Sequence, residues 1–213
     1  MVIVLLGAPG AGKVTQAPIL AKKLGVPILA SGDLLRAVAR TGSDLGREVD
    51  EVMRSGALVS DSTTVRIFLD RLAQPDAAAG AILDGFPRTA AQAAALDAAL
   101  AERGSRVDAA ILIDVPEDEL IGRMTARLVC RADSTHVYNV LSKPPRQDRV
   151  CDIDGAELYQ RADDAPDTMR ARFRKQLAPL AEVVAHYEGD GILRTVDGRK
   201  PIDAVTEQVI AAL

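Results

Sequence analysis

The sequence predicts an α/β protein in which helices cover both faces of a parallel sheet. Three short runs are continuously apolar rather than alternating, which is typical of strands buried on both faces: VIVLL at 2–6, AILD at 81–84 and AAILIDV at 109–115. Segments 27–30 and 192–196 are two shorter strand candidates. Helical periodicity occupies much of the chain between these runs, and strand and helix in alternation favour a parallel sheet.

The predicted helices support the same α/β fold. Helical spacing of apolar residues predicts seven of them, at about 13–24, 31–40, 61–73, 89–103, 116–126, 163–188 and 202–212. Pro179 falls inside the long C-terminal helix, where it should produce a kink or a boundary. From about Leu128 to Gln160 the helical period disappears, and Arg, Asp, Ser and Pro become frequent. This region therefore predicts a small inserted subdomain, since so long a structureless loop is unusual in a compact domain.

Composition sets the outer limits on function. The 213 residues are 48% hydrophobic, which is enough to bury a sizeable core. The net charge of −4 gives no overall field that favours nucleic acid or an anionic membrane, so we expect neither as a partner. The chain has no apolar stretch of about 20 residues and no secretory signal at its first residues. With only Cys130 and Cys151 as cysteines, it is expected to be cytoplasmic.

The stretch GAPGAGKVTQ at 7–16 has the composition of a phosphate-binding turn. Its glycines allow the backbone to turn tightly with N–H groups facing inward, and a helix begins nearby with its positive dipole end. Lys13 supplies a charge for the outer phosphates of a nucleotide, and Thr15 supplies a hydroxyl near a Mg²⁺ ion. Val14 stands where the general pattern has Ser or Thr.

Two further clusters indicate a second substrate. SGDLLR at 31–36 opens a helix with a hydroxyl as its cap and places Arg36 where it can hold another phosphate. DGFPRT at 84–89 follows a buried strand, so Asp84 lies at a strand's carboxyl end, where open α/β sheets bind ligands. Arg88 and Gln92 are four residues apart and share one helix face.

In this order the motifs resemble those of the adenylate kinases in their long-lid form. The resemblance runs from Val2 to about Val205 and includes GAPGAGK, SGDLLR, GALV, LDGFPRT, ELYQRADD and VDGRKP. It implies a phosphate-loop core with five parallel strands, formed by residues 1–30, 60–126 and 162–213. Two inserts complete the expected organisation, an AMP-binding segment at 31–59 and a lid at 127–161.

The resemblance also implies roles for individual residues. It implies that the charge of the phosphoryl group passing between the nucleotides is stabilised by Lys13, Arg88, Arg123, Arg127, Arg161 and Arg172. ATP would be held by Gly10, Ala11, Gly12, Lys13, Val14, Thr15, Arg123, Arg127, Val137, Tyr138 and Lys200. AMP would be held by Ser31, Arg36, Ala57, Leu58, Val59, Gly85, Phe86, Pro87, Arg88, Gln92, Arg161 and Arg172. Asp33 and Asp84 would be outer-shell carboxylates of the magnesium site.

The chain departs from the family pattern at two places. Glycine is usual at position 14, so Val14 brings a β-branched side chain into the first helical turn. We expect its methyl groups to point away into packing; the alternative is that they crowd the loop and slow the reaction about tenfold to hundredfold. Ser31 replaces the usual threonine but keeps the hydroxyl.

The second departure is in the lid, at the positions where the family carries zinc ligands. Cys130, Asp133, Cys151 and Asp154 form two matched C-x-x-D pairs, and both thiolate and carboxylate bind tetrahedral Zn²⁺. A hydrogen-bonded polar cluster and a Cys130–Cys151 disulfide are the alternatives to zinc, the disulfide being least favoured in the cytoplasm. His136 is an alternative ligand, although lone surface positions are expected for both it and His186.

These inferences predict an enzyme that transfers the terminal phosphoryl group of Mg-ATP reversibly to AMP, and the resemblance implies that it is a monomer. Two other interpretations remain. One is a kinase for UMP, CMP or GMP, against which Val59 and Gln92 argue because they resemble adenine-facing positions. The other is a nucleotide-binding protein whose catalysis is impaired by Val14.

Overall fold

A computed structural model describes residues 1–54, 59–161 and 166–213, and in the last range the side chains of 173 and 177–213. Its main sheet has five strands, all paired in parallel in the order β2-β3-β1-β4-β8. The strands are β1 (Val2–Leu6), β2 (Ile28–Ala30), β3 (Ala81–Asp84), β4 (Val107–Asp114) and β8 (Leu193–Asp197). All five candidates are confirmed, and so is their parallel arrangement.

The two faces of the sheet carry separate hydrophobic clusters, because side chains alternate along each strand. Ile3 and Leu5 of β1 pack on one face with residues of α1, α6, α7 and α8. Val2, Val4 and Leu6 pack on the other with residues of α4, α5 and α7. These helices are α1 (Lys13–Leu24), α4 (Asp61–Leu72), α5 (Ala90–Glu102), α6 (Glu117–Thr125), α7 (Pro166–Gly189) and α8 (Ile202–Ala211). A 3₁₀ turn, η1 (Pro75–Ala77), precedes β3.

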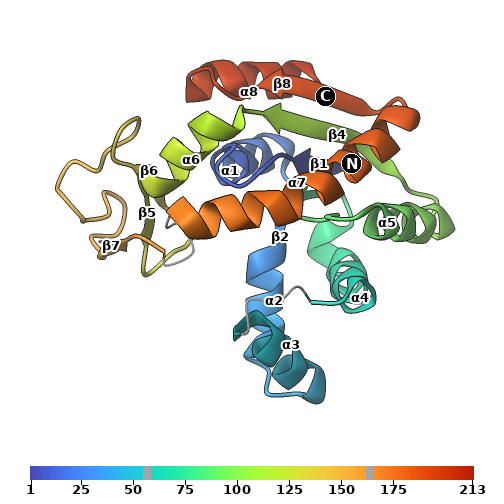
Figure 1. Cartoon of the computed structure of the whole chain (residues 1–213). Coiled ribbons are helices and arrows are strands. Elements are labelled where there is room, and N and C mark those ends of the chain that lie inside the picture. The colour runs from blue at the N-terminus through green and yellow to red at the C-terminus, as the bar shows by residue number, and fades with distance from the viewer. Residues whose placement is uncertain (55–58, 162–165) are drawn as a thin grey trace.

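Two helices, α2 (Ser31–Ala39) and α3 (Asp44–Arg54), extend away from the sheet (Figure 1). The helix at 44–54 is absent from our sequence prediction, because most of its residues are polar and only Gly46 and Val49 are buried. Its stability comes from packing against α2 rather than from a large apolar face. The long helix α7 continues through Pro179, so of the two expected effects, a kink or a boundary, the boundary does not occur.

The predicted inserted subdomain contains a small antiparallel sheet in the order β6-β5-β7. Its strands are β5 (Arg127–Cys130), β6 (Val137–Asn139) and β7 (Leu158–Tyr159). They enclose a satellite cluster of five buried residues: Leu128, Cys130, Tyr138, Cys151 and Leu158. With so small a core, this subdomain gains little stability from apolar burial alone.

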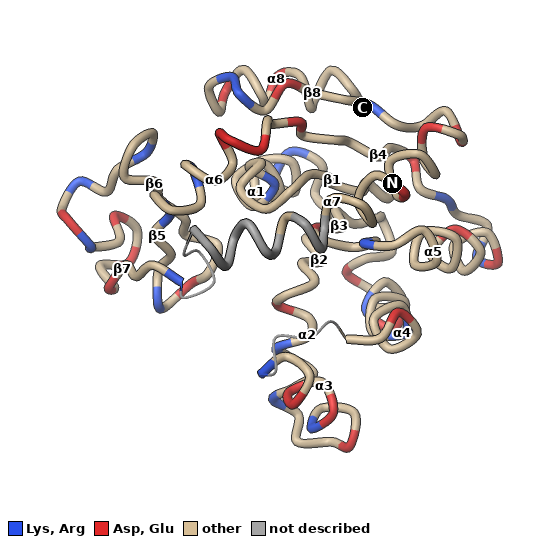
Figure 2. The backbone as a smooth tube through the Cα atoms, in the orientation of Figure 1, with Lys and Arg blue, Asp and Glu red and all other residues tan. Residues whose placement is uncertain are grey.

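Charged residues of both signs are interspersed over the molecule (Figure 2). Among the described residues, no helix combines the length and apolar character required to cross a bilayer. Because charges of both signs are interspersed, a strongly anionic ligand must be bound by basic residues that are grouped locally.

Candidate nucleotide-binding site

The turn between β1 and α1 is shaped by its glycines. Gly7, Gly10 and Gly12 have φ angles of 141°, 87° and 107°, which side chains rarely adopt. A Cβ atom on Gly7 would lie 2.8 Å from the Ile113 carbonyl oxygen, and one on Gly10 would lie 2.9 Å from Met124 Cγ. Gly12 is the N-cap of α1, so the free N–H groups of the first helical turn open onto this loop.

Lys13 is positioned by the same loop. Its Nζ donates to the carbonyl oxygens of Gly7 at 2.6 Å and Ala8 at 3.1 Å. The Asp84 carboxylate lies at the neighbouring strand end, because β1 and β3 pair Leu5 with Asp84. Burial raises the pKa of Asp84, and the nearby charges of Lys13 and Arg88 act in the opposite direction with less effect. A buried carboxylate beside two cations can orient them and bind a hydrated divalent ion.

Val14 does not disrupt the turn. The loop closes through hydrogen bonds from Ala11 N to Ala8 O at 3.1 Å and from Thr15 N to Gly12 O at 3.0 Å. The Val14 side chain is 39% exposed and lies on the wall of the cleft described below. The expectation that its methyl groups point into packing is therefore wrong.

A second polar group forms around Arg88, on the loop between β3 and α5. Its Nη2 donates to Ser31 Oγ at 2.7 Å and its Nε donates to the Gly85 carbonyl oxygen at 2.7 Å. Ser31 is the first residue of α2, whose N-cap is Ala30, and no side chain caps that helix. The capping role predicted for the Ser31 hydroxyl is thus wrong, because the hydroxyl faces Arg88 instead.

Arg36 lies further along α2 and is partly exposed. Its Nη2 donates to Asp33 Oδ1 at 2.6 Å, and the same carboxylate oxygen accepts from Ser134 Oγ of the inserted subdomain at 3.4 Å. Asp33 therefore touches both inserts that the sequence predicts.

These groups share one cleft of about 1190 Å³. Most predicted nucleotide-contacting residues line it, and they come from stretches spread along the whole chain: Gly10, Ala11, Gly12, Lys13, Val14, Thr15, Ser31, Asp33, Arg36, Val59, Asp84, Gly85, Pro87, Arg88, Gln92, Arg123, Arg127, Val137, Tyr138, Arg161 and Lys200. Phe86 is the exception among the described ones, because it is fully buried and stacks on Phe68 with ring centroids 4.0 Å apart. Ala57, Leu58 and the Arg172 side chain lie outside the described residues.

Two other predicted residues are held by contacts away from the phosphate loop. Arg123 Nη1 donates to the Gly198 carbonyl oxygen at 2.9 Å, which ties α6 to the loop containing Lys200. Tyr138 is 4% exposed, and its hydroxyl accepts from the Asp152 backbone N–H at 2.8 Å. Tyr138 lines the cleft, and its hydroxyl is engaged by the protein backbone.

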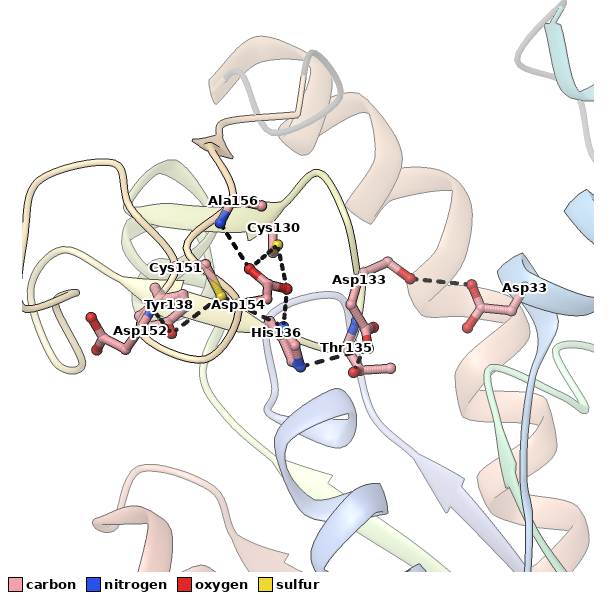
Figure 3. A network of polar contacts seen from close by, with 11 residues as sticks. Asp33, Cys130, Asp133, Thr135, His136, Tyr138, Cys151, Asp152, Asp154 and Ala156 are labelled. Carbon is pink, nitrogen blue, oxygen red and sulfur yellow. Dashed lines mark hydrogen bonds and ion pairs between the residues drawn. The ribbon is translucent and has the colours of Figure 1, made fainter.

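The inserted subdomain also contains a group of potential metal ligands (Figure 3). Ligand atoms of Cys130, His136, Cys151 and Asp154 all lie within 4.8 Å of one another. His136 Nδ1 is 3.0 Å from Asp154 Oδ2 and 3.5 Å from Cys151 Sγ. Both cysteines are buried and free, so there is no disulfide. Two thiols, an imidazole and a carboxylate are a set that suits tetrahedral Zn²⁺.

Asp133 lies outside this group. Its Oδ1 accepts from the backbone N–H of Thr135 at 2.8 Å and from the Thr135 hydroxyl at 2.7 Å, and these bonds lower the pKa of Asp133. Its Oδ2 is 3.6 Å from His136 Nε2, the ring nitrogen that faces away from the cysteines. The structure thus brings His136 to the cysteines where the sequence pattern indicated Asp133.

Within this group of potential metal ligands, the pKa values of the Asp154 carboxyl and the Cys130 thiol are shifted in opposite directions. The Ala156 backbone N–H, helped by the Cys151 thiol, lowers the pKa of Asp154 to about 2. Burial raises the pKa of the Cys130 thiol.

His186 was expected to be a lone surface histidine, which is wrong: its Nε2 lies 2.6 Å from Asp97 Oδ2 and joins α7 to α5.

Asp61 is a residue that the sequence analysis missed. Its carboxylate accepts from Gln92 Nε2 at 2.7 Å and from the Thr89 hydroxyl at 3.0 Å. The local signal at 60–63 indicates only a helix start, with Ser60 as the N-cap of α4. No local sequence pattern indicates that Asp61 contacts Gln92, because the two residues are 31 positions apart.

A glycine-shaped turn between a buried strand and a helix, at the carboxyl edge of a parallel sheet, defines a nucleotide-binding protein of the phosphate-loop class. Within that class, residues 5–192 match the family model described as adenylate kinase. The chain belongs to the adenylate kinase family.

Curated relatives agree over the whole chain. A protein named adenylate kinase from Kosmotoga olearia is 45% identical over 213 residues, covering 100% of this chain and 99% of that protein. Proteins of the same name from Streptomyces avermitilis and Archaeoglobus fulgidus are each 44% identical over 213 residues, covering 100% of this chain and 97% and 98% of those proteins.

We predict that Asp84→Asn gains stability relative to the unsubstituted protein as the pH rises from about 4 to 7. Burial raises the pKa of Asp84 in the folded chain, so above about pH 3.9 its ionisation favours the unfolded chain, whereas asparagine does not ionise. Urea unfolding of both proteins at several pH values measures the difference. A difference that stays constant, or that favours the aspartate at higher pH, would show that Lys13 and Arg88 outweigh the burial.

Proposed function

We propose that this chain catalyses the reversible, Mg²⁺-dependent transfer of the terminal phosphoryl group of ATP to AMP, giving two ADP. The supporting observation is that the phosphate loop with Lys13 and the Arg88 group open into one cleft of about 1190 Å³. One cleft with two cationic centres suits two phosphorylated substrates whose ends must meet. Membership of the adenylate kinase family supports the same reaction.

The chemistry requires little from the protein beyond positioning and charge. The attacking oxygen of AMP is already anionic at neutral pH, so the reaction needs no general base. We assign charge stabilisation between the nucleotides to Lys13, Arg88, Arg123, Arg127, Arg161 and Arg172. Lys13 and Arg88 are oriented by protein carbonyls, which fixes the donors before the substrates bind.

The two nucleotides divide the cleft. ATP is assigned to Gly10–Thr15, Arg123, Arg127, Val137, Tyr138 and Lys200. AMP is assigned to Ser31, Arg36, 57–59, Gly85, Phe86, Pro87, Arg88, Gln92, Arg161 and Arg172. Because Phe86 is fully buried, its part is to support the loop that carries Gly85 and Arg88. Because the Tyr138 hydroxyl is engaged by the Asp152 backbone N–H, the ring is the part of Tyr138 assigned to contact adenosine.

Magnesium fits the oxygen donors at the phosphate loop. Thr15, Asp33 and Asp84 line the cleft, and hydroxyl and carboxylate oxygens are the ligands that Mg²⁺ prefers. The ion supplies charge neutralisation on the phosphates of ATP. The burial of Asp84 and its proximity to Lys13 support a role for its carboxylate in holding water molecules of such an ion.

We assign residues 1–30, 60–126 and 162–213 to a core, 31–59 to an AMP-binding segment and 127–161 to a lid. Closing of the two inserts would exclude water, which otherwise would hydrolyse ATP. Since one chain supplies both nucleotide sites, we infer a monomer. Two free thiols support a reducing, cytoplasmic location.

We also propose that the lid binds a structural Zn²⁺ ion through Cys130, His136, Cys151 and Asp154. The approach of Asp133 to the far ring nitrogen of His136 supports an orienting role for Asp133 rather than direct ligation. A metal would compensate for the small apolar core of this subdomain, because binding energy at a structural site adds to folding energy.

The proposed reaction is tested by a coupled assay of ADP formation from Mg-ATP with AMP, UMP, CMP or GMP. We expect AMP to exceed the other acceptors in kcat/KM by about tenfold or more. Lys13→Met is the control, and it should reduce kcat/KM by roughly a hundredfold or more because it removes a charge beside the transferring group. Equal or faster turnover with another monophosphate would contradict the assignment of AMP.

Replacement of Val14 by glycine should change kcat/KM for AMP by less than about threefold, which is under roughly 0.7 kcal/mol of barrier. The reason is that the two loop hydrogen bonds described above form with valine present and that Val14 is 39% exposed. The same coupled assay compares the two proteins. Turnover in Val14→Gly alone would mean that valine crowds the bound phosphates and that the unsubstituted chain only binds nucleotides.

The zinc proposal is tested by metal content and by unfolding rather than by activity. We expect about one zinc per chain by elemental analysis. His136→Ala should lose zinc on dialysis, whereas Asp133→Asn should keep it with an affinity reduced by about tenfold. EDTA should lower the midpoint of thermal unfolding of the unsubstituted protein and of Asp133→Asn, but not that of His136→Ala. Loss of zinc from Asp133→Asn with retention in His136→Ala would make Asp133 the ligand.

A further inference from the structure

The side-chain amide of Gln92 is held at both ends. Gln92 lies in the first turn of α5, lines the cleft and is 4% exposed. Its Nε2 donates to Asp61 Oδ1 at 2.7 Å, and its Oε1 accepts from the Arg88 backbone N–H at 2.8 Å. A carboxylate can only accept and a backbone N–H can only donate. The chemistry of the two partners therefore fixes which end of the amide carries the oxygen.

Asp61 is itself fixed in place. It belongs to the first turn of α4, and its second oxygen accepts from the hydroxyl of Thr89, the N-cap of α5, at 3.0 Å. Its carboxylate thus connects the N-terminal ends of two helices, where a negative charge is favourable. The two helices pack against each other, so the carboxylate is a rigid reference point for the amide.

One donor and one acceptor of the amide are left for a ligand. The amide nitrogen has two N–H groups and the oxygen has two lone pairs, and each atom uses one of them in the contacts above. An adenine presents an amino donor beside a ring-nitrogen acceptor, which pairs with such an amide in a bidentate manner. Hypoxanthine and guanine present a carbonyl acceptor beside an N1–H donor, so the fixed amide would meet them with like groups facing each other.

We propose that Asp61 is a positioning residue that sets the base selectivity of the monophosphate site, by fixing the Gln92 amide in the orientation that accepts adenine. The proposal rests on the proposed function, which puts the base of AMP at Gln92. With Asp61 present, turning the amide over breaks two hydrogen bonds and opposes like groups at both ends. Without Asp61, only the Arg88 N–H resists the turn.

The test compares AMP with IMP, because hypoxanthine differs from adenine mainly by the reversed donor and acceptor. We expect Asp61→Ala to lower the ratio of kcat/KM for AMP to that for IMP by about tenfold or more, within the range of one bidentate contact. Gln92→Leu should lower the ratio similarly. In the Gln92→Leu background, Asp61→Ala should change it by less than about twofold, since residues that act as a unit are not additive.

Asp70→Ala is the matched control, because it removes an exposed carboxylate from the same helix α4, and it should leave the ratio unchanged. Asp61→Ser, which keeps a residue suited to a helix start but is too short to reach Gln92, replaces Asp61→Ala if the latter fails to fold. Calorimetric binding of AMP and IMP provides the same ratio without turnover.

An equal loss for AMP and IMP in Asp61→Ala would overturn the proposal, because it would indicate a purely structural role. So would an undiminished effect of Asp61→Ala in the Gln92→Leu background. Failure of the unsubstituted protein to convert AMP would refute the proposed function instead. If calorimetry then showed AMP and IMP bound equally, the role of Asp61 would fall as well.

Discussion

The parallel pairing of β1 with β3 is the constraint on which the site depends. Both strands are fully buried, and their register places Leu5 opposite Asp84, so the phosphate loop and the Asp84 carboxylate leave the sheet at the same edge. A slip of one residue would move Asp84 by about 3.3 Å along the strand and away from Lys13. Apolar packing on the two faces of the sheet therefore determines the geometry of charged groups at its edge.

Three basic side chains of the cleft donate to neutral backbone oxygens, whereas Arg36 pairs with the Asp33 carboxylate. Lys13 donates to the carbonyl of Gly7, Arg88 to that of Gly85 and Arg123 to that of Gly198. A carbonyl directs a cation without cancelling its charge, and a phosphate oxygen is a stronger acceptor for the same donor. This arrangement favours preorganisation, because little rotamer freedom remains to be lost when an anion binds.

Local sequence patterns predicted the parts of this molecule whose physics is local. Continuous apolar runs located β1, β3 and β4, shorter candidates located β2 and β8, and glycine spacing with Lys13 located the phosphate loop. Contacts between distant segments have no such signal: the approach of His136 to the cysteines depends on the pairing of β5 with β6, and the Asp61–Gln92 contact depends on helix packing. The Ser31 hydroxyl was misassigned for the same reason, because Arg88 lies 57 residues away in the sequence. The helix at 44–54 escaped prediction because its tertiary partner, α2, compensates for a weak apolar pattern.

The hydrogen bond from Ser134 to Asp33 is an exposed and long contact between the two inserts, at 3.4 Å. A single hydrogen bond of ordinary strength contributes about 0.5–1.5 kcal/mol, which shifts a two-state equilibrium by roughly twofold to twelvefold. Moving such an equilibrium from 1:99 to 99:1 requires a differential affinity of about 10⁴. In the proposed closing of the two inserts, this contact would supply a small fraction of the free energy, and the bound nucleotides would supply most of the rest. The population of closed molecules would then follow the concentrations of ATP and AMP.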